Sequence, residues 1–305
     1  MKIVLAGATG FIGNALIKAL LEEKHHLIIL SRRPDVLRNQ WGDTVKAVFW
    51  DAVSSGDWFS DINEADAIIN LTGASIAGKR WDASYKKIIA DSRILSTRIL
   101  MKACHVAQQK PKTWINASAV GYYGDVPEGD VDETRHASDD FLGRTCAAWE
   151  NEVLQAETLG IRVVCLRIGI VLEEGGGALE KMVLPFKLFV GGPLGSGRQW
   201  LPWIHRDDLV RAVLFILNEK TIRGPVNGTA PMPVTMKQFS QTLGSVLRRP
   251  SWAPVPGFVL KIVVGEFSDS LLAGQKALPV KLQNAGFRFT FDELHAALRD
   301  IFIKK

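Results

Sequence analysis

The chain has 305 residues, of which 47% are hydrophobic and 23% charged, proportions typical of a globular protein with a sizeable buried core. Its formal net charge of +5 comes from basic residues interspersed with acidic ones, which favours a phosphorylated small molecule over a nucleic-acid partner. No apolar run approaches the roughly 18 residues of a membrane span and no apolar leader precedes the first strand pattern, so we expect a cytoplasmic protein without a membrane partner.

The first part of the chain alternates between strand and helix patterns. Apolar strand patterns cover residues 2–6, 26–30, 47–50, 67–71, 113–117 and 162–171, and helical periodicity covers 12–23, 84–108 and 141–159. Strands that are apolar at nearly every position are buried on both faces, as in a parallel sheet covered by helices. The order predicts an α/β fold with a doubly wound parallel sheet of the Rossmann type.

The composition changes after about residue 172, where glycine, proline and aromatic residues become frequent. We therefore predict a cofactor-binding Rossmann domain over 1–172, with return elements from about 203–230 that include a helix at 207–217. Residues 173–305 are expected to form mostly a smaller C-terminal substrate lobe, with a helical end over 250–305 and a last helix at 292–301. The three cysteines are widely spaced and form no Cys/His cluster, so no metal site is expected.

A glycine-rich segment lies between the first strand and the first helix. Gly7 would allow a sharp turn, Gly10 a close approach of the backbone to phosphates, and Gly13 close packing of helix and strand. A dinucleotide pyrophosphate needs such a bare backbone at the positive end of a helix. The predicted cofactor contacts here are Gly7, Thr9, Gly10, Phe11, Ile12 and Gly13. The alternative is an ordinary glycine-rich turn.

The end of the second strand predicts which dinucleotide is bound. An acidic residue there would bind the ribose hydroxyls of NAD, but the sequence reads Ser31-Arg32-Arg33. Two guanidinium groups and a hydroxyl suit the 2′-phosphate of NADP, so NADP(H) is the expected cofactor. The alternative is a pair of solvated surface arginines. Asp51, after the third strand, is expected near the adenine, with a turn-capping role as the alternative.

These residues resemble the extended short-chain dehydrogenase/reductases, the epimerase-like branch. The likeness includes the segment 7–13, the segment Asn70–Ala74 with Gly73, and Ser118. More narrowly, residues 191–208 (GGPLGSGRQWLPWIHRDD), 274–276 and 286–287 resemble an atypical subgroup described as "epimerase family protein" or NADP-dependent oxidoreductase. The resemblance extends over essentially the whole chain. It implies that Leu71, Thr72, Arg93 and Val171 also line the cofactor.

The chain departs from this superfamily at its usual Tyr-x-x-x-Lys pair. In the superfamily the lysine lowers the tyrosine pKa and holds the nicotinamide ribose, the tyrosine exchanges a proton with the substrate oxygen, and a serine polarises that oxygen. Here Leu142 and Cys146 stand where the tyrosine and lysine would be expected. Neither side chain can act as that acid/base pair, so the usual mechanism is not expected.

Four residues are the candidates for replacing this chemistry. They are Ser118, Tyr122, Tyr123 and His205. The two tyrosines follow Ser118 on a loop that should face the nicotinamide, but packing aromatics are common in such loops. His205 could titrate near neutral pH, or it could be hydrogen-bonded at a helix start. Glu150 is a further alternative, as a displaced base or as a solvated helix carboxylate.

Three functions follow from this pattern. The first is an NADP(H)-dependent oxidoreductase acting on a small carbonyl or hydroxyl compound. The second is a non-catalytic NADP(H)-binding or redox-sensing protein, and the third is a nucleotide-sugar epimerase or dehydratase. The third fits least, because those enzymes use the missing Tyr/Lys pair. The substrate is not evident from the sequence, and a homodimer is an option by analogy with the superfamily.

Overall fold

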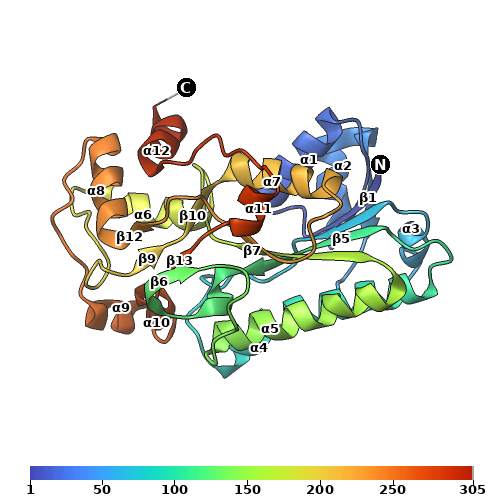
Figure 1. Cartoon of the computed structure of the whole chain (residues 1–305), viewed down its shortest axis with the longest axis horizontal. Coiled ribbons are helices and arrows are strands. Elements are labelled where there is room, and N and C mark those ends of the chain that lie inside the picture. Colours follow the sequence, from blue (N-terminus) through green and yellow to red (C-terminus); the bar gives the residue numbers. More distant parts are fainter. Residues whose placement is uncertain (304–305) are drawn as a thin grey trace.

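The core of the molecule is a seven-stranded parallel sheet with the order β11-β7-β5-β4-β1-β2-β3 (Figure 1). The computed structural model describes residues 1–303; residues 304 and 305 of the expected C-terminal lobe lie outside the described residues. The strands of this sheet are β1 (Lys2–Ala6), β2 (His26–Ser31), β3 (Val45–Phe49), β4 (Ala67–Asn70), β5 (Thr113–Ala119), β7 (Arg162–Ile168) and β11 (Gly224–Gly228).

The apolar strands form the middle of this sheet. Leu5 of β1 pairs with Ile29 of β2 on one side and with Ile69 of β4 on the other, and all three side chains are fully buried. Strands that are buried on both faces need helices above and below them. The sequence prediction of a doubly wound parallel sheet is confirmed.

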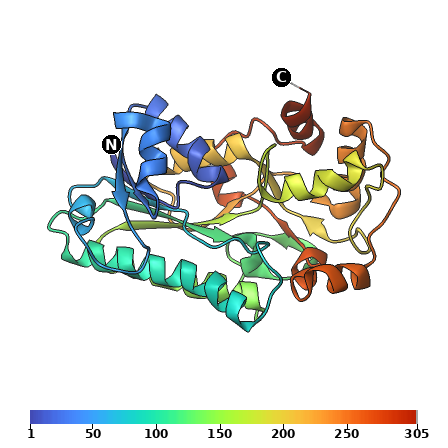
Figure 2. The same ribbon diagram turned by 180° about the vertical axis from the view of Figure 1, so that it is seen from behind.

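Helices cover both faces of the sheet, as Figures 1 and 2 show. The core on one face includes residues of α1 (Phe11–Glu22), α2 (Pro34–Trp41), α7 (Arg206–Asn218) and α11 (Val280–Asn284). The core on the other face includes residues of α3 (Phe59–Ile62), α4 (Ala83–Val106) and α5 (Phe141–Leu154). Within residues 1–303, no helix is long and apolar enough to cross a bilayer.

The remaining elements build a smaller lobe beside the carboxyl ends of the strands (Figure 1). Its core combines residues of α6 (Gly177–Lys187), α8 (Met236–Leu247) and α12 (Leu294–Phe302). The helices α9 (Gly257–Val264) and α10 (Phe267–Leu272) lie between α8 and α12 in the sequence. Short strands pair as β8 (Ile170–Leu172) with β10 (Trp203–His205), β9 (Trp200–Leu201) with β12 (Val234–Thr235), and β6 (Val126–Val131) with β13 (Gln275–Ala277). Residues 1–303 also contain three 3-10 turns: η1 (Gly42–Thr44), η2 (Val120–Tyr123) and η3 (Gln155–Leu159).

Two expected elements are divided in the structure. The helix expected over 141–159 is α-helical to Leu154 and continues as the 3-10 turn η3. The strand expected over 162–171 breaks at Gly169, where an added Cβ would lie 2.5 Å from the Pro202 carbonyl oxygen. This close approach of two backbones directs β7 into the main sheet and β8 toward β10 in the lobe.

Candidate functional site

A groove of about 480 Å³ lies at the carboxyl ends of β1, β2, β3 and β4. In doubly wound folds, ligands bind where neighbouring strands connect in opposite directions, as β1 does here between β2 and β4. Ten of the residues predicted to bind cofactor line the groove: Gly7, Thr9, Gly10, Ser31, Arg32, Arg33, Asp51, Leu71, Thr72 and Gly73. Sequence reasoning missed the other lining residues, which are Leu30, Trp50, Ala52, Val53, Ala74, Ile88, Asp91, Ser92 and Leu95.

The three glycines of the first loop are required for different reasons. Gly7 has a φ of +76°, and an added Cβ would lie 2.6 Å from the Leu71 carbonyl carbon. At Gly13 an added Cβ would lie 2.4 Å from the Ala8 carbonyl oxygen, so only glycine lets α1 approach this turn. At Gly10 a Cβ would meet no protein atom closer than 3.8 Å, and its φ of −86° suits any residue. The fold therefore does not require glycine at position 10, whereas a phosphate seated on the helix N-terminus would.

The basic segment after β2 forms part of the lining of this groove. The Ser31 hydroxyl accepts a hydrogen bond from the backbone N–H of Arg33 at 3.1 Å, which shapes the turn into α2. The side chains of Arg32 and Arg33 are exposed, and neither forms an ion pair or hydrogen bond within residues 1–303. Two guanidinium groups that line a groove have the charge and hydrogen-bond donors that suit a phosphate group.

Asp51 lies in the same groove and also shapes its own turn. Its carboxylate accepts hydrogen bonds from the backbone N–H groups of Val53 and Ser54, at 2.8 and 2.7 Å. These bonds lower the pKa of Asp51, and the bond from Ser54 has the larger effect. Asp51 therefore caps its own turn, as the alternative prediction had it, and this loop also forms part of the groove wall.

Two polar atoms of the groove residues are buried without a hydrogen bond among the described residues. They are the Thr72 hydroxyl and the Trp50 indole N–H. Leaving a buried polar group without a partner costs about 1–3 kcal/mol, so such atoms commonly mark the place of a ligand. Together with the bare backbone at Gly10, they fit a dinucleotide lying along the groove.

The remaining predicted cofactor residues lie around the groove rather than in its lining. Phe11 and Ile12 begin α1, and the Phe11 ring lies against the lobe, where an added Cβ on Gly176 would be 2.5 Å from it. Val171 is part of β8, opposite Ile204 of β10. Arg93 of α4 lies next to the groove residue Gly73. Contact of these side chains with a cofactor stays a prediction.

Ser118 belongs to a buried polar network beneath the carboxyl end of β5. Its hydroxyl donates to Glu150 Oε1 at 2.6 Å, and the same carboxylate accepts two hydrogen bonds of 2.8 Å from Arg167. Ser118 and Arg167 are direct neighbours in the register of β5 and β7, so their side chains leave the sheet on the same face. The Ser118 hydroxyl therefore donates its proton to the hydrogen bond with Glu150 and not to a ligand in this structure.

Tyr123 extends the same network. Its hydroxyl donates to Asn227 Oδ1 at 2.7 Å and accepts from Arg167 at 2.9 Å. Burial raises the pKa of Tyr123 to about 12. The Tyr123 hydroxyl thus has both a hydrogen-bond acceptor and a donor as partners, and its bond to Asn227 connects η2 to β11. Its proton is buried away from solvent.

Tyr122 differs from its neighbour in both exposure and partners. Its ring lies 3.5 Å from the Arg167 guanidinium, and within residues 1–303 its hydroxyl makes no hydrogen bond. The tyrosine is partly exposed, on the turn that directly follows β5. Of the two tyrosines predicted as proton donors, Tyr122 is the one with a free hydroxyl.

The positions expected for the relay pair carry apolar or inert groups. Leu142 packs on Gly121, where an added Cβ would lie 3.4 Å from it. Cys146 is buried on α5, and burial raises the pKa of its thiol to about 11. At neutral pH this thiol stays protonated, so Cys146 supplies neither a charge nor a base.

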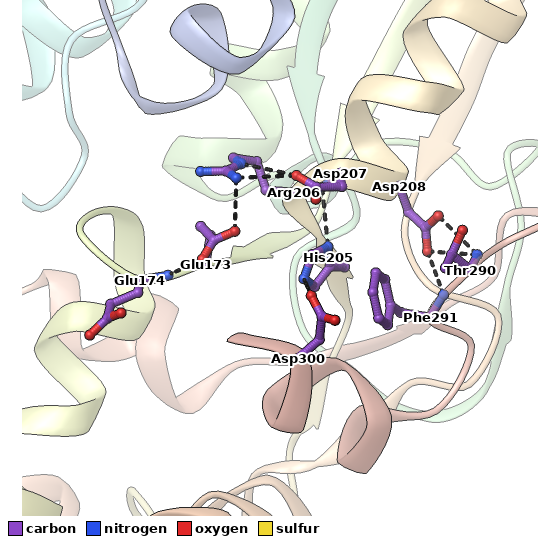
Figure 3. Close-up of polar contacts among 9 residues, drawn as sticks. All are labelled: Glu173, Glu174, His205, Arg206, Asp207, Asp208, Thr290, Phe291 and Asp300. Atoms are coloured by element: carbon purple, nitrogen blue, oxygen red, sulfur yellow. Dashed lines mark hydrogen bonds and ion pairs between the residues drawn. The ribbon is translucent and has the colours of Figure 1, made fainter. Parts of the chain in front are cut away.

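His205 lies in a different region, between α7 and the C-terminal segment (Figure 3). Its Nδ1 accepts the backbone N–H of Asp207 at 3.2 Å, which caps α7. Its ring packs on Phe291 with a centroid distance of 4.0 Å, and Nε2 lies 3.8 Å from Asp300 Oδ2. His205 is fully buried and is not part of the groove lining. The structure displays the helix-capping alternative; catalysis by His205 has no geometric support here.

The burial of His205 leads to a pH-dependent stability. Burial lowers its pKa below 6.5, although Asp207, Glu173, Asp300 and Asp208 oppose the effect. As the pH falls, the unfolded chain therefore binds this proton before the folded protein does. We expect the free energy of unfolding to be highest above pH 6.5 and to decrease as the pH drops through 6.5 toward the lowered pKa.

Urea unfolding at about pH 8 and about pH 5.5 would measure this decrease. The His205→Asn variant provides the comparison, because asparagine can cap α7 but does not titrate. The difference in unfolding free energy between the two pH values should be smaller in this variant. Identical differences in wild type and variant would rule out His205 as the source.

Fold and groove together define a Rossmann-type protein with a dinucleotide-binding crevice. The model of the NAD dependent epimerase/dehydratase family matches residues 3–227, and a domain of unknown function, DUF1731, matches residues 255–301. The chain therefore belongs to the NAD dependent epimerase/dehydratase family. The resemblance to the epimerase-like branch of the short-chain dehydrogenase/reductases is confirmed.

Individual relatives agree with this assignment. The epimerase family protein YfhF of Bacillus subtilis is 42% identical over 302 residues, covering 99% of this chain and 98% of YfhF. The crystal structure of human epimerase family protein SDR39U1 (isoform 2) with NADPH has a TM-score of 0.87 at 35% identity, covering 99% of both chains. UDP-glucuronic acid 4-epimerase from Bacillus cereus, solved with UDP-glucuronic acid and NAD, has a TM-score of 0.77 at 18% identity, which shows a shared fold alone.

Proposed function

We propose that this protein is an NADP(H)-dependent oxidoreductase acting on a small carbonyl or hydroxyl compound. The observation that carries the cofactor assignment is the position of Arg32 and Arg33, two exposed guanidinium groups that line the groove and form no ion pair within residues 1–303. They would hold the 2′-phosphate, with the pyrophosphate on the backbone around Gly10. The NADPH bound in human SDR39U1, a 35% identical protein, supports the same cofactor.

NADPH supplies hydride when bound, so the protein must bind and orient the substrate and provide a proton. Tyr122 is the residue that we assign to protonation of the substrate oxygen. Tyr122 lies on the turn η2 that directly follows β5, at the same carboxyl edge of the sheet as the groove, and its ring packs against the Arg167 guanidinium. Reduction then consumes one hydride and the Tyr122 proton to give the alcohol, and solvent returns the proton to Tyr122.

The Tyr122→Phe variant tests this assignment. With NADPH and a panel of small aldehydes and ketones, we expect kcat to fall about 10²-fold or more while NADPH affinity stays unchanged. Absorbance of NADPH measures turnover, and calorimetry measures binding. Val36→Ala, an exposed position on α2, serves as the matched surface control with unchanged turnover. Unchanged kcat in Tyr122→Phe would contradict the role of Tyr122.

One observation favours a second candidate function, a non-catalytic NADP(H)-binding or redox-sensing protein. The Ser118 and Tyr123 hydroxyls are both held in a buried network, and neither is available to polarise a substrate oxygen. NADPH binding by the wild type without turnover of any compound in the panel would favour this candidate. A nucleotide-sugar epimerase fits less well, since Leu142 and Cys146 replace the pair that such chemistry uses.

A further inference from the structure

The connection between α8 and α9 presents a stripe of exposed apolar side chains. It runs parallel to residues 191–194 through two isolated β-bridges, and its residues alternate between partly buried and exposed. Side chains two positions apart in an extended segment share one face. The exposed ones here are Trp252, Pro254, Pro256 and Phe258. Figures 1 and 2 both place this connection at the end of the lobe away from the main sheet.

Helix α9 continues this stripe. Phe258 and Ile262 lie four residues apart, on the same side of the helix, and each is 69% exposed. Val263, next to Ile262, is 67% exposed, whereas Leu260 is turned into the lobe. The helix therefore leaves one apolar face uncovered by residues 1–303.

The turn after α6 lies beside the stripe. The Trp252 indole N–H donates to the Phe189 carbonyl oxygen at 3.0 Å, and Leu188 and Phe189 are both exposed. Phe189 has a φ of +65°, a strained conformation for a bulky residue, which is often found at functional sites. We call these side chains the lobe-end patch: Leu188, Phe189, Trp252, Pro254, Pro256, Phe258, Ile262 and Val263. Exposed apolar patches of this kind mark a surface that binds a partner.

The charge around the lobe-end patch is positive. Residues 181–206 and 236–265 include no aspartate or glutamate. Their exposed cations include Lys187, Arg248, Arg249 and Lys261, none of which forms an ion pair within residues 1–303. Arg249 lies over the Phe189 ring, 4.4 Å from its centroid, and Lys261 belongs to α9. A second copy of the chain would bring like charges together, so the patch suits an anionic partner.

We propose that the lobe-end patch binds the surface of a bilayer that contains anionic phospholipids. Its aromatic and aliphatic side chains enter the boundary between headgroups and acyl chains, while its lysine and arginines contact the lipid phosphates. The expectation of no membrane partner rested on the absence of an apolar run long enough to span a bilayer, and surface binding needs no such run. The proposal does not depend on the proposed oxidoreductase activity.

Co-sedimentation of the full chain with lipid vesicles tests the proposal. We expect the protein to sediment with vesicles of equal parts phosphatidylcholine and phosphatidylglycerol, and to stay in solution with phosphatidylcholine alone. Raising the salt from about 0.1 M to about 1 M shortens the Debye length from about 10 Å to about 3 Å and should release most of the bound protein.

Two sets of substitutions separate the apolar from the charged contribution. Phe258→Ser with Ile262→Ser should weaken binding at least about tenfold. Phe49→Ser with Val106→Ser is the matched control, because these side chains are 62% and 66% exposed but lie outside the lobe. Glutamine at positions 248, 249 and 261 should weaken binding about fivefold for each charge removed. The same change at the exposed lysines 18, 102 and 220 lowers the net charge equally and should have little effect.

Tryptophan fluorescence locates the contact. Trp252 is the one exposed tryptophan within residues 1–303, so phosphatidylglycerol with brominated acyl chains should quench its emission and leave the buried indoles bright. Trp252→Phe should abolish this quenching while the protein still sediments with the vesicles.

Four results would overturn the proposal. They are no sedimentation with the anionic vesicles, equal sedimentation with both kinds of vesicle, losses in the control variants as large as those in the patch variants, and quenching that persists in Trp252→Phe. Because NADPH binding is measured separately, none of these results bears on the proposed function.

Discussion

Replacing Arg32 and Arg33 together with alanine is expected to weaken NADPH binding by at least tenfold and to leave NADH binding nearly unchanged. Each charge-assisted contact to the 2′-phosphate contributes about 1.5–3 kcal/mol, and NADH has no phosphate at that position. Both side chains are exposed and form no ion pair or hydrogen bond within residues 1–303, so their removal breaks none of these interactions. Parallel calorimetric titration with NADPH and NADH measures the effect.

Arg38→Ala is the matched control for this pair. Arg38 lies on the same segment and carries the same charge, but it pairs with Asp35 and the Ala47 carbonyl instead of lining the groove. Its loss should change NADPH affinity little. Equal weakening of NADPH and NADH in the double variant would show that the arginines do not discriminate the 2′-phosphate. No binding of either cofactor by the wild type would make the groove vestigial.

The second large effect concerns stability, through Glu150. The Glu150→Gln variant should lower the free energy of unfolding by about 3–5 kcal/mol, because it leaves Arg167 buried with no carboxylate. Arg167 is 2% exposed and Glu150 4% exposed, so solvent cannot compensate either charge. The same change also weakens the bond that orients Ser118. Urea-induced unfolding followed by circular dichroism measures the loss.

Glu152→Gln provides the comparison on the same helix. Glu152 pairs with Arg98 at the surface, where an ion pair contributes at most about 1 kcal/mol. A loss in Glu150→Gln no larger than that in Glu152→Gln would contradict the importance of the buried pair.

The sheet could be predicted from the sequence because its strands are buried on both faces. Runs such as 3–6 and 67–69 are apolar throughout, and no half-exposed strand would have that pattern. The lobe could not be predicted in the same way. The pairing of β6 with β13 joins segments almost 150 residues apart, and β6 reads VPEGDV, which has no strand pattern. Such pairing depends on tertiary contacts that local composition does not encode.

In the candidate site, too, local sequence predicted some residues, whereas others depend on tertiary contacts. The glycines and arginines of the first two loops could be predicted, since their function depends on residue type and spacing within one βα unit. The wall formed by Ile88, Ser92 and Leu95 could not, because it depends on how α4 lies across the sheet. The state of Ser118 also needed the structure: its partner Glu150 lies 32 residues away, and Arg167 lies on the neighbouring strand.

The last strand of the main sheet, β11, comes from residues 224–228, after the chain has already made a long excursion into the lobe. A fragment ending near residue 172 would therefore contain six of the seven strands of the main sheet and leave β7 as an open edge. The residues of β7 from Val163 to Leu166 are fully buried in the intact protein, and an exposed apolar edge of this kind recruits other chains. We therefore expect the first 172 residues produced alone to aggregate, because the strand that covers β7 is supplied only after the chain has passed through the lobe.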